Sequence, residues 1–226
     1  MDSKHSGKLA LFDLDNTLLA GDSDHAWGEF LINRNLVNED KHRQENDYFY
    51  EQYKQGKLDI HGYVKFTLTP ILQMNATERD RLHQEFMKDA IAPLVLDSAQ
   101  SLVARHKSAG DFCIIISATN EFITTPIAKE FQVDHLISTE LEINNGSYTG
   151  NISGTPCYQA GKVEKLQRWL DSRNDDMRIS EAVFYSDSIN DLPLLEQVAT
   201  PVVVDPDDQL RDKAQNLNWE IISLRT

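Results

Sequence analysis

The order of apolar and polar stretches along the chain predicts a sheet of buried strands connected by helices. Short apolar runs of strand length occupy residues 8–12, 112–116, 182–185, 202–204 and 220–223. Continuous apolar runs of this length are typical of parallel strands that are buried on both faces. Helices are expected between them at residues 98–108, 121–131, 162–172, 192–196 and 208–216. This alternation predicts an α/β fold with a doubly wound, mostly parallel sheet.

The segment 20–92 has a different pattern. It contains no strand-like run, and apolar or aromatic residues recur three or four positions apart, as at Trp27 and Phe30. This spacing is typical of amphipathic helices, and we expect three or four of them. The chain is therefore predicted to form a core from residues 1–19 and 93–226, with residues 20–92 inserted as a helical cap.

Two local signals refine this outline. Thr77-Glu78-Arg79-Asp80 resembles a capping box, which predicts that the last helix of the insertion begins at Thr77. Asn144-Asn145-Gly146 separates the apolar stretches 136–143 and 148–152. Asn-Gly between two such stretches is a strong hairpin signal, so we expect two antiparallel strands there.

The charge of the chain restricts its partners. With 22 Lys and Arg against 36 Asp and Glu, the formal net charge is −14. This sign is unsuited to a phosphate backbone, so nucleic acid is an unexpected partner. A small anionic substrate would also be repelled, and any phosphate site must contain local positive charge.

The two cysteines indicate a reducing environment. Cys113 lies in an apolar run and Cys157 follows Gly-Thr-Pro, so neither suggests a disulfide framework or a zinc site. The N-terminal residues lack the apolar stretch of a secretory signal, and the apolar runs are too short to span a membrane. We expect a cytoplasmic protein, a monomer or homodimer, without a membrane partner.

A first polar motif follows the first predicted strand. Asp13-Leu14-Asp15-Asn16-Thr17 begins where the apolar run 8–12 ends. The carboxyl ends of strands are the usual place for chemistry in an open α/β sheet. Asp and Asn are also ordinary loop residues, so this motif alone does not separate catalysis from a turn.

Two further candidates follow later elements. Ser117 comes directly after the apolar run 112–116, where its hydroxyl would face the same sheet edge, or would instead cap the next helix. Lys162 lies in the first turn of a predicted helix, where a cation opposes the helix dipole. A nearby anion would explain this position, and an exposed lysine that tolerates the dipole is the alternative.

The fourth motif follows another apolar strand. In Tyr185-Ser186-Asp187-Ser188-Ile189-Asn190-Asp191 two acids stand four positions apart, and both can face one point near the strand end. An Asx-type turn leading into a helix is the structural alternative. Each of the four features is common by itself. Asp, Ser, Lys and Asp in this order after four separate elements favour a shared phosphoryl-transfer site.

These motifs resemble those of the haloacid dehalogenase superfamily over the whole chain. The helical insertion resembles the cap of the phosphoserine-phosphatase-like branch. The resemblance implies a Mg²⁺-dependent phosphatase that acts on a small-molecule phosphate ester, with Asp13 as the nucleophile that forms an aspartyl phosphate. Asp15 would protonate the leaving oxygen and then deprotonate the attacking water.

The resemblance also implies the ligands of the site. Mg²⁺ prefers hard oxygen ligands and would be held by Asp13, the backbone carbonyl of Asp15 and Asp187, with Asp191 close by. Ser117 and Lys162 would orient and neutralise the phosphoryl oxygens. For Thr17 and Asn190 we expect either a phosphate contact or a role in positioning the loops.

The cap gives a hypothesis about the substrate. Asp22 stands where phosphoserine phosphatases place an acid for the substrate ammonium, although it is also suited to cap the first cap helix. Their Arg for the substrate carboxylate has no counterpart: Thr67 stands near that place, and Lys65 lacks the bidentate geometry of Arg. This pattern suits an amino-alcohol phosphate such as histidinol phosphate, and an amino-acid phosphate such as phosphoserine is the other candidate.

The aromatic residues of the cap have two interpretations. Tyr48, Phe49, Tyr50 and Tyr53 crowd one predicted helix. Packing between the cap helices is the expectation, in preference to a ring-stacking pocket.

Two other activities use similar residues. A phosphotransferase would pass the phosphoryl group from Asp13 to an acceptor hydroxyl in place of water, and the sequence does not separate the two reactions. Phosphate-sensing receiver domains also cluster Asp, a hydroxyl and Lys around Mg²⁺. Receivers are shorter and lack the long insertion, which has an evident use as a lid over a substrate.

Overall fold

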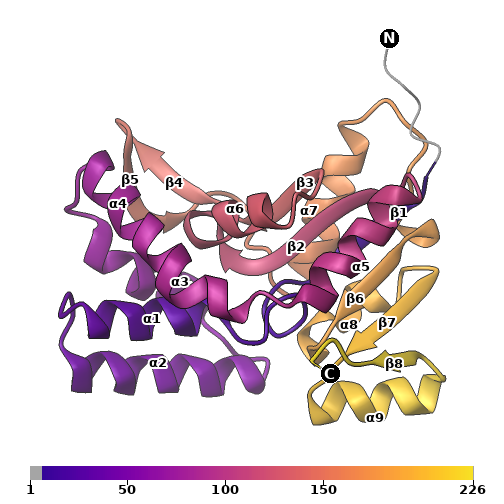
Figure 1. The fold of residues 1–226 in the computed structure, drawn as a ribbon, viewed down its shortest axis with the longest axis horizontal. Helices are drawn as coiled ribbons and strands as arrows, with labels where there is room; N and C mark the ends of the chain where they lie inside the picture. Colours follow the sequence, from indigo (N-terminus) through magenta and orange to yellow (C-terminus); the bar gives the residue numbers. More distant parts are fainter. Residues whose placement is uncertain (1–6, 226) are drawn as a thin grey trace.

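A parallel sheet forms the centre of the molecule in the computed structural model, which describes residues 7–225 (Figure 1). Its six strands follow the order β3-β2-β1-β6-β7-β8, and each neighbouring pair is parallel. The strands are β1 (Leu9–Phe12), β2 (Phe112–Asn120), β3 (His135–Thr139), β6 (Val183–Ser186), β7 (Thr200–Val204) and β8 (Glu220–Ile222). The predicted doubly wound α/β fold is confirmed.

Helices cover both faces of this sheet because its strands are apolar on both sides. In β1, Ala10 and Phe12 pack into one core, and Leu9 and Leu11 pack into the other. The first core contains α5 (Asp97–Ser108) and α6 (Glu121–Glu130). The second contains α7 (Ala160–Asp171), α8 (Leu192–Leu195) and α9 (Asp208–Leu217). Strand β1 is thus buried in the middle of the molecule, and the residue that follows it is held in a rigid setting.

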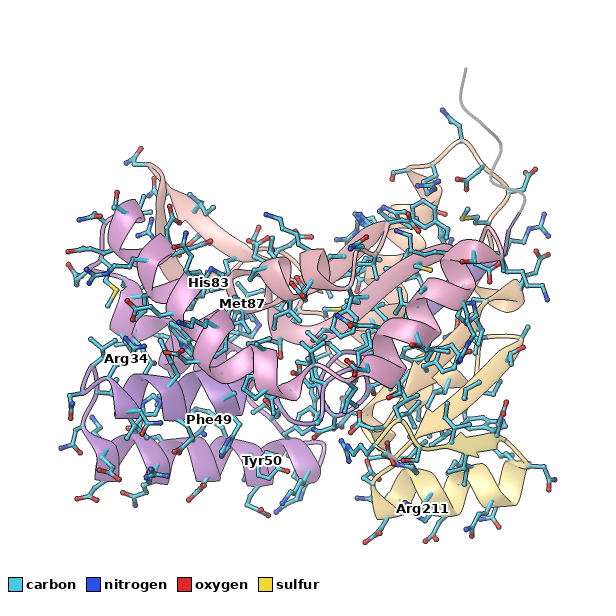
Figure 2. The ribbon with its side chains drawn as sticks, viewed as in Figure 1. Arg34, Phe49, Tyr50, His83, Met87 and Arg211 are labelled. Carbon is cyan, nitrogen blue, oxygen red and sulfur yellow. The ribbon has the colours of Figure 1, made fainter. Side chains whose placement is uncertain are left out.

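The insertion after β1 is helical, as the spacing of its apolar residues predicts. It comprises α1 (Ser23–Asn33), α2 (Glu39–Lys54), α3 (Ile60–Leu68) and α4 (Ala76–Phe86). Helices α1 and α2 pack side by side at one side of the molecule, and α9 lies at the other side (Figure 1). Figure 2 shows the same separation between Phe49 and Tyr50 of α2 and Arg211 of α9. Trp27 of α1 is buried against Phe86 and Phe122, so the insertion shares its apolar interior with the core.

Two connections join the insertion to the sheet, and they are bonded to each other. Leu19 and Val95 form an antiparallel bridge. The backbone N–H of Ala20 donates to the carbonyl of Leu94 at 2.8 Å. The outgoing and returning segments therefore form a short two-stranded ribbon.

Two local expectations are wrong in detail. The stretch 136–143 is two strands, because the chain leaves the sheet after β3 and starts the hairpin of β4 (Leu141–Asn144) and β5 (Ser147–Ile152). At the break, Leu141 begins β4, and its N–H donates to the carboxylate of Glu121 at 2.9 Å. The Asn-Gly turn itself is confirmed.

The capping box of α4 lies two residues earlier than predicted. Asn75 is the N-cap, and its side chain accepts from the N–H of Glu78 at 3.0 Å. The carboxylate of Glu78 accepts in return from the N–H of Asn75 at 2.8 Å. Glu is preferred over Asp at the third helical position, so Glu78 sets the start of the helix and Thr77 falls inside its first turn.

No helix within residues 7–225 is both long enough and apolar enough to cross a membrane.

Candidate active site

Asp13 stands at the carboxyl end of the central strand. Its backbone N–H continues the sheet by donating to the carbonyl of Tyr185 at 2.9 Å, and its side chain is buried. Oδ1 of Asp13 accepts from Nζ of Lys162 at 2.7 Å. The same ammonium donates to Asp191 at 2.7 Å. The structure therefore brings together three of the predicted residues from three separate elements.

Lys162 is the positive charge that the acidic chain requires at a phosphate site. It lies in the first turn of α7 and is only 2% exposed, which overturns the alternative of an exposed lysine. Burial alone would lower the pKa of Lys162, but the carboxylates of Asp13 and Asp191 outweigh it and raise the pKa above its usual value. The ammonium therefore stays charged beside the carboxylate oxygen of Asp13.

Thr17 joins Asp13 to Asp187. Its Oγ1 lies 3.3 Å from Oδ2 of Asp13 and 3.1 Å from Oδ1 of Asp187. A hydroxyl has one proton, so it can donate to only one of these carboxylates at a time. Burial and the nearby carboxylates of Asp13 and Asp191 raise the pKa of Asp187 well above its usual value. Negative charge is therefore in excess at this point.

This donor set fits a hard divalent cation. Within residues 7–225 no three His, Cys, Asp or Glu side chains are arranged to hold a metal by themselves. Mg²⁺ does not need such a cage, because it is usually bound by one or two carboxylates together with water and substrate phosphate. Asp13 and Asp187, which share the Thr17 hydroxyl, supply a pair of this kind.

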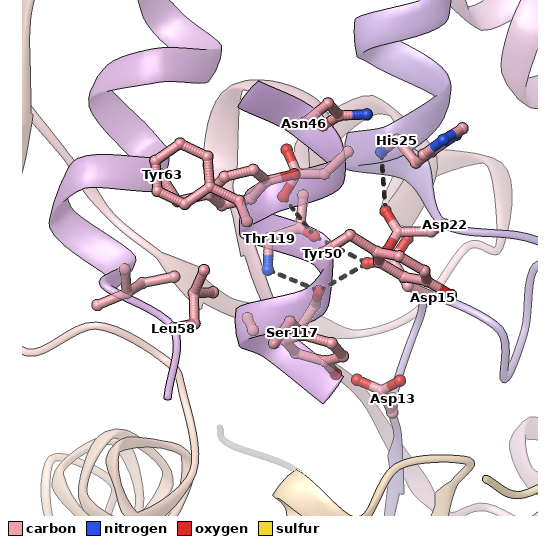
Figure 3. A pocket seen from close by; sticks show the side chains of 15 residues that line it. Asp13, Asp15, Asp22, His25, Asn46, Tyr50, Leu58, Tyr63, Ser117 and Thr119 are labelled. Carbon is pink, nitrogen blue, oxygen red and sulfur yellow. Dashed lines mark hydrogen bonds between the residues drawn. The ribbon is translucent and has the colours of Figure 1, made fainter. Parts of the chain in front are cut away.

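Asp15 lies two residues after Asp13 and is held by donors from two elements. Oδ1 accepts from the N–H of Ser23 at 2.7 Å. Oδ2 accepts from the hydroxyl of Thr119 at 2.8 Å, and Asp15 and Thr119 are both labelled in Figure 3. Burial and the carboxylate of Asp22 raise the pKa of Asp15 to about 6, although these hydrogen bonds oppose the rise. A carboxyl group with this pKa is suited to general acid and base catalysis near neutral pH.

Ser117 and Thr119 face the site together from β2. The strand continues to Asn120, so residues 117 and 119 point to the same side of the sheet. The hydroxyl of Ser117 lies 3.4 Å from Asp15 and does not cap α6, whose N-cap is Asn120. Thr119 was missed by the sequence reasoning. The spacing Ser117-x-Thr119 could have identified it, because residues two apart in a strand face the same side of the sheet. This holds only if the strand extends beyond Ile116, which was not predicted.

Asn190 connects the fourth motif to the cap. Its Nδ2 donates to the carbonyl of Tyr53 at 3.1 Å, and its Oδ1 accepts from Gln159 at 3.1 Å. The hydroxyl of Tyr53 also donates to Ser188 at 3.3 Å. Both ends of the Asn190 amide are thus used within the protein, which favours loop positioning over a phosphate contact. Thr17 is engaged in the same way by the carboxylates described above.

A cavity lies between the insertion and this edge of the sheet (Figure 3). Its charged and polar lining comprises Asp13, Asp15, Asp22, Asp24, His25, Asn46, Ser117 and Thr119. Its aromatic lining comprises Phe49, Tyr50, Tyr53 and Tyr63. None of the described residues that line it is a Lys or an Arg. The packing role expected for the α2 aromatics is therefore incomplete, since Phe49, Tyr50 and Tyr53 also form a wall of the cavity.

The cap residues singled out from the sequence have different positions. Asp22 lines the cavity, but it is the N-cap of α1, and its side chain accepts from the N–H of His25 at 2.9 Å. Lys65 is exposed on α3 and does not line the cavity. Thr67 is buried and donates to the carbonyl of Val64 at 3.0 Å. The cap therefore presents acids and rings to the cavity.

Known sequences agree with this picture. A family model described as haloacid dehalogenase-like hydrolase matches residues 10–196. The chain is 42% identical over 219 residues to a histidinol-phosphatase from Neisseria meningitidis serogroup C, which covers 96% of this chain and 99% of the relative. It is 29% identical over 222 residues to the phosphoserine phosphatase SerB1 from Mycobacterium tuberculosis, covering 96% and 70% of the two chains.

Solved structures share the fold. A protein of unknown function from Bordetella pertussis Tohama I has a TM-score of 0.89 and 40% identity, covering 96% of this chain and 99% of that one. A substrate-bound phosphoserine phosphatase has a TM-score of 0.69 and 16% identity, covering 96% and 93%. At such low identity the second likeness concerns the fold alone.

Proposed function

The chain belongs to the haloacid dehalogenase-like hydrolase family and is a phosphatase, and we propose that it hydrolyses a small phosphate ester of a cationic amino alcohol, such as histidinol phosphate. One observation carries this proposal: the cavity beside Asp13 and Asp15 is lined by carboxylates and aromatic rings, without Lys or Arg among its described residues. Phosphoserine carries a carboxylate that would need a cation there. A cationic amino alcohol needs acids and rings.

The histidinol-phosphatase from Neisseria supports the same substrate class. Its likeness to this chain extends over 96% of the sequence and thus includes the cap residues as well as the core. We also propose that residues 20–92 act as the cap that sets this preference, with the core residues performing the chemistry.

The reaction proceeds in two steps. The carboxylate of Asp13 attacks phosphorus and forms an aspartyl phosphate, while the bond from phosphorus to the ester oxygen breaks. Asp15 donates its proton to the departing oxygen, so the product leaves as an alcohol. Asp15 then takes a proton from water, which attacks the aspartyl phosphate and releases inorganic phosphate, restoring both residues.

The remaining core residues hold the phosphoryl group. Lys162, which lies 2.7 Å from Oδ1 of Asp13, neutralises a phosphoryl oxygen beside the attacking carboxylate, and the Ser117 hydroxyl donates to another. A bound Mg²⁺ would be held by Asp13, the backbone carbonyl of Asp15 and Asp187, with Asp191 nearby, and would reduce the repulsion between carboxylate and phosphate.

The proposal is tested by comparing substrates on the purified chain. Phosphate release is measured from histidinol phosphate, phosphoserine and p-nitrophenyl phosphate, each with Mg²⁺ and with excess EDTA. We expect kcat/KM for histidinol phosphate to exceed that for phosphoserine by more than about tenfold, a difference of about 1.4 kcal/mol. Activity should disappear with EDTA and return with Mg²⁺. Equal values for the two amino compounds would remove the assigned substrate class.

A further inference from the structure

Asp24 is a buried carboxylate that the proposed reaction does not use. It is the second residue of α1, is 7% exposed and lines the cavity. Its Oδ2 accepts from the hydroxyl of Thr119 at 3.1 Å, whereas its Oδ1 has no hydrogen-bond partner among the described residues. A buried carboxylate with an unsatisfied oxygen is costly, so its retention here requires an explanation.

The hydroxyl of Thr119, which is the hydrogen-bond donor to Asp24, is shared with Asp15. The same Oγ1 lies 2.8 Å from Oδ2 of Asp15. Its single proton serves one carboxylate at a time, and the shorter distance favours Asp15. While Thr119 donates to Asp15, neither oxygen of Asp24 has a protein donor. A buried carboxylate in this position is completed by a proton or by a cation that enters the cavity.

Asp22, two residues earlier, is in the opposite situation. Its side chain already accepts from the N–H of His25 at the start of α1, and it is only partly buried. An N-cap of this kind is worth about 1 kcal/mol to the helix. Asp22 therefore has a structural use that accounts for its presence, whereas Asp24 keeps one buried oxygen without a partner among the described residues.

The position of Asp24 also suits the geometry of the substrate. Asp15 must stand at the ester oxygen to protonate it, and one hydroxyl, that of Thr119, separates the carboxylates of Asp15 and Asp24. In a 2-amino alkyl phosphate, the carbon that bears the ammonium is bonded to the carbon that bears the ester oxygen. A carboxylate one hydroxyl away from Asp15 thus faces the place where the ammonium lies.

We propose that Asp24 binds the ammonium group of the substrate and that Asp22 does not. This inference rests on the proposed function, because it concerns the substrate class assigned there. Burial, with the carboxylates of Asp22 and Asp15, raises the pKa of Asp24 well above its usual value, which agrees with a group that ionises against an entering cation.

The test compares one substrate with its deaminated analogue. For wild type, Asp24→Asn and Asp22→Asn, kcat/KM is measured with histidinol phosphate and with the same alcohol phosphate lacking the amino group. The ratio of the two values reports the recognition of the ammonium. We expect a wild-type ratio of about 10–100, the size of one charged hydrogen bond. The ratio should fall to near 1 in Asp24→Asn and stay within about threefold of wild type in Asp22→Asn.

A misfolded variant is recognised independently. Asp24→Asn preserves the shape of the side chain and removes a buried charge, so its melting temperature should equal or exceed that of wild type. Its kcat/KM for p-nitrophenyl phosphate, which has no ammonium, should fall by a much smaller factor than its kcat/KM for histidinol phosphate. A loss on this substrate equal to the loss on histidinol phosphate would overturn the assignment, because the defect would then be unrelated to the ammonium.

The remaining outcomes separate this inference from the proposed function. An unchanged ratio in Asp24→Asn with a collapsed ratio in Asp22→Asn would overturn the assignment of Asp24 while leaving the substrate class intact. A wild-type ratio near 1 would remove the substrate class and, with it, the inference.

Discussion

The two halves of the site differ in how their charges are balanced. In the half built by the sheet, Lys162 lies 2.7 Å from both Asp13 and Asp191, so part of the negative charge is neutralised within the protein. In the half facing the insertion, Asp22 and Asp24 line the cavity without a Lys or Arg among the described lining residues. The first half is prepared for any phosphate ester. Under the proposed function, the second half is completed by the positive charge of the substrate's amino group.

This difference separates chemistry from selectivity. Variants of the core half should impair every substrate to a similar degree, whereas loss of the Asp24 carboxylate should impair cationic substrates in particular. The predictions below are ordered from the largest effect to the smallest and examine this division from both sides.

Asp13→Asn is expected to have the largest effect. It removes the nucleophile, and loss of a nucleophile lowers turnover by more than about 10⁴-fold in comparable covalent mechanisms. Phosphate release from histidinol phosphate and p-nitrophenyl phosphate should fall together to the background rate, while the melting temperature stays near that of wild type. If the remaining turnover were higher for the substrate with the ammonium, the assignment of chemistry to the core half and selectivity to the cap half would be contradicted.

Asp15→Asn should slow turnover by about 10²–10⁴-fold, because it removes the proton donor and the base for the second step. With p-nitrophenyl phosphate, whose leaving group needs no proton, the first step should remain faster than the second. Rapid mixing should then show a burst of about one p-nitrophenolate per enzyme, followed by slow release. A wild-type steady-state rate would remove the acid and base assignment.

Lys162→Met should lower kcat by about 10²–10³-fold for all substrates, since it removes the ammonium from the phosphoryl site. It also leaves Asp13 and Asp191 without their buried partner, which should reduce the free energy of unfolding by about 3–5 kcal/mol. Urea unfolding and steady-state kinetics measure the two effects. Lys165→Met is the matched control: Lys165 is also buried in α7 but pairs with Glu140, so kcat should change by less than about threefold.

Asp22→Asn should change the pH dependence more than the rate. The carboxylate of Asp22 helps burial to raise the pKa of Asp15 to about 6. Because Asp15 must carry its proton in the first step, kcat/KM for histidinol phosphate should fall as the pH rises through this value. Removing the negative neighbour lowers the pKa of Asp15, so the decline of kcat/KM should begin at a lower pH than in wild type. A shift to higher pH would contradict the assignment.

Tyr53→Phe should have the smallest effect. It keeps the ring in the cavity wall and removes the hydroxyl that donates to Ser188 at 3.3 Å. One neutral hydrogen bond is worth about 0.5–1.5 kcal/mol, so kcat should fall by less than about tenfold. Tyr48→Phe, which alters an exposed ring on the same helix, is the control and should have no effect. A larger loss for Tyr53→Phe would place its hydroxyl on the substrate.

The core half could be predicted from the sequence because topology determines where it forms. The carboxyl ends of neighbouring parallel strands meet at one edge, so residues that follow β1 and β6 must lie near each other. Asp13, Lys162 and Asp191 could therefore be assigned to one site from their motifs, without knowledge of how side chains pack. The strand β2 was predicted too short because Ser117, Thr119 and Asn120 are polar and resemble a loop, although they stay in the sheet.

The cap half could not be predicted in the same way. Helices α1 and α2 contribute to the cavity only through their mutual packing, which no short motif specifies. Asp22 and Asp24 stand two positions apart at the start of one helix, and both match a capping signal. Only the folded structure distinguishes them, because the Asp22 side chain accepts from the N–H of His25 and Oδ1 of Asp24 has no partner among the described residues.

The bridge between Leu19 and Val95 ties the exit of the insertion to its return. Because Ala20 also donates to Leu94, the two connecting segments cannot separate without losing these bonds. A movement of the insertion away from the sheet would have to carry both segments together. It would also break the hydrogen bonds that join Tyr53 to Ser188 and Asn190.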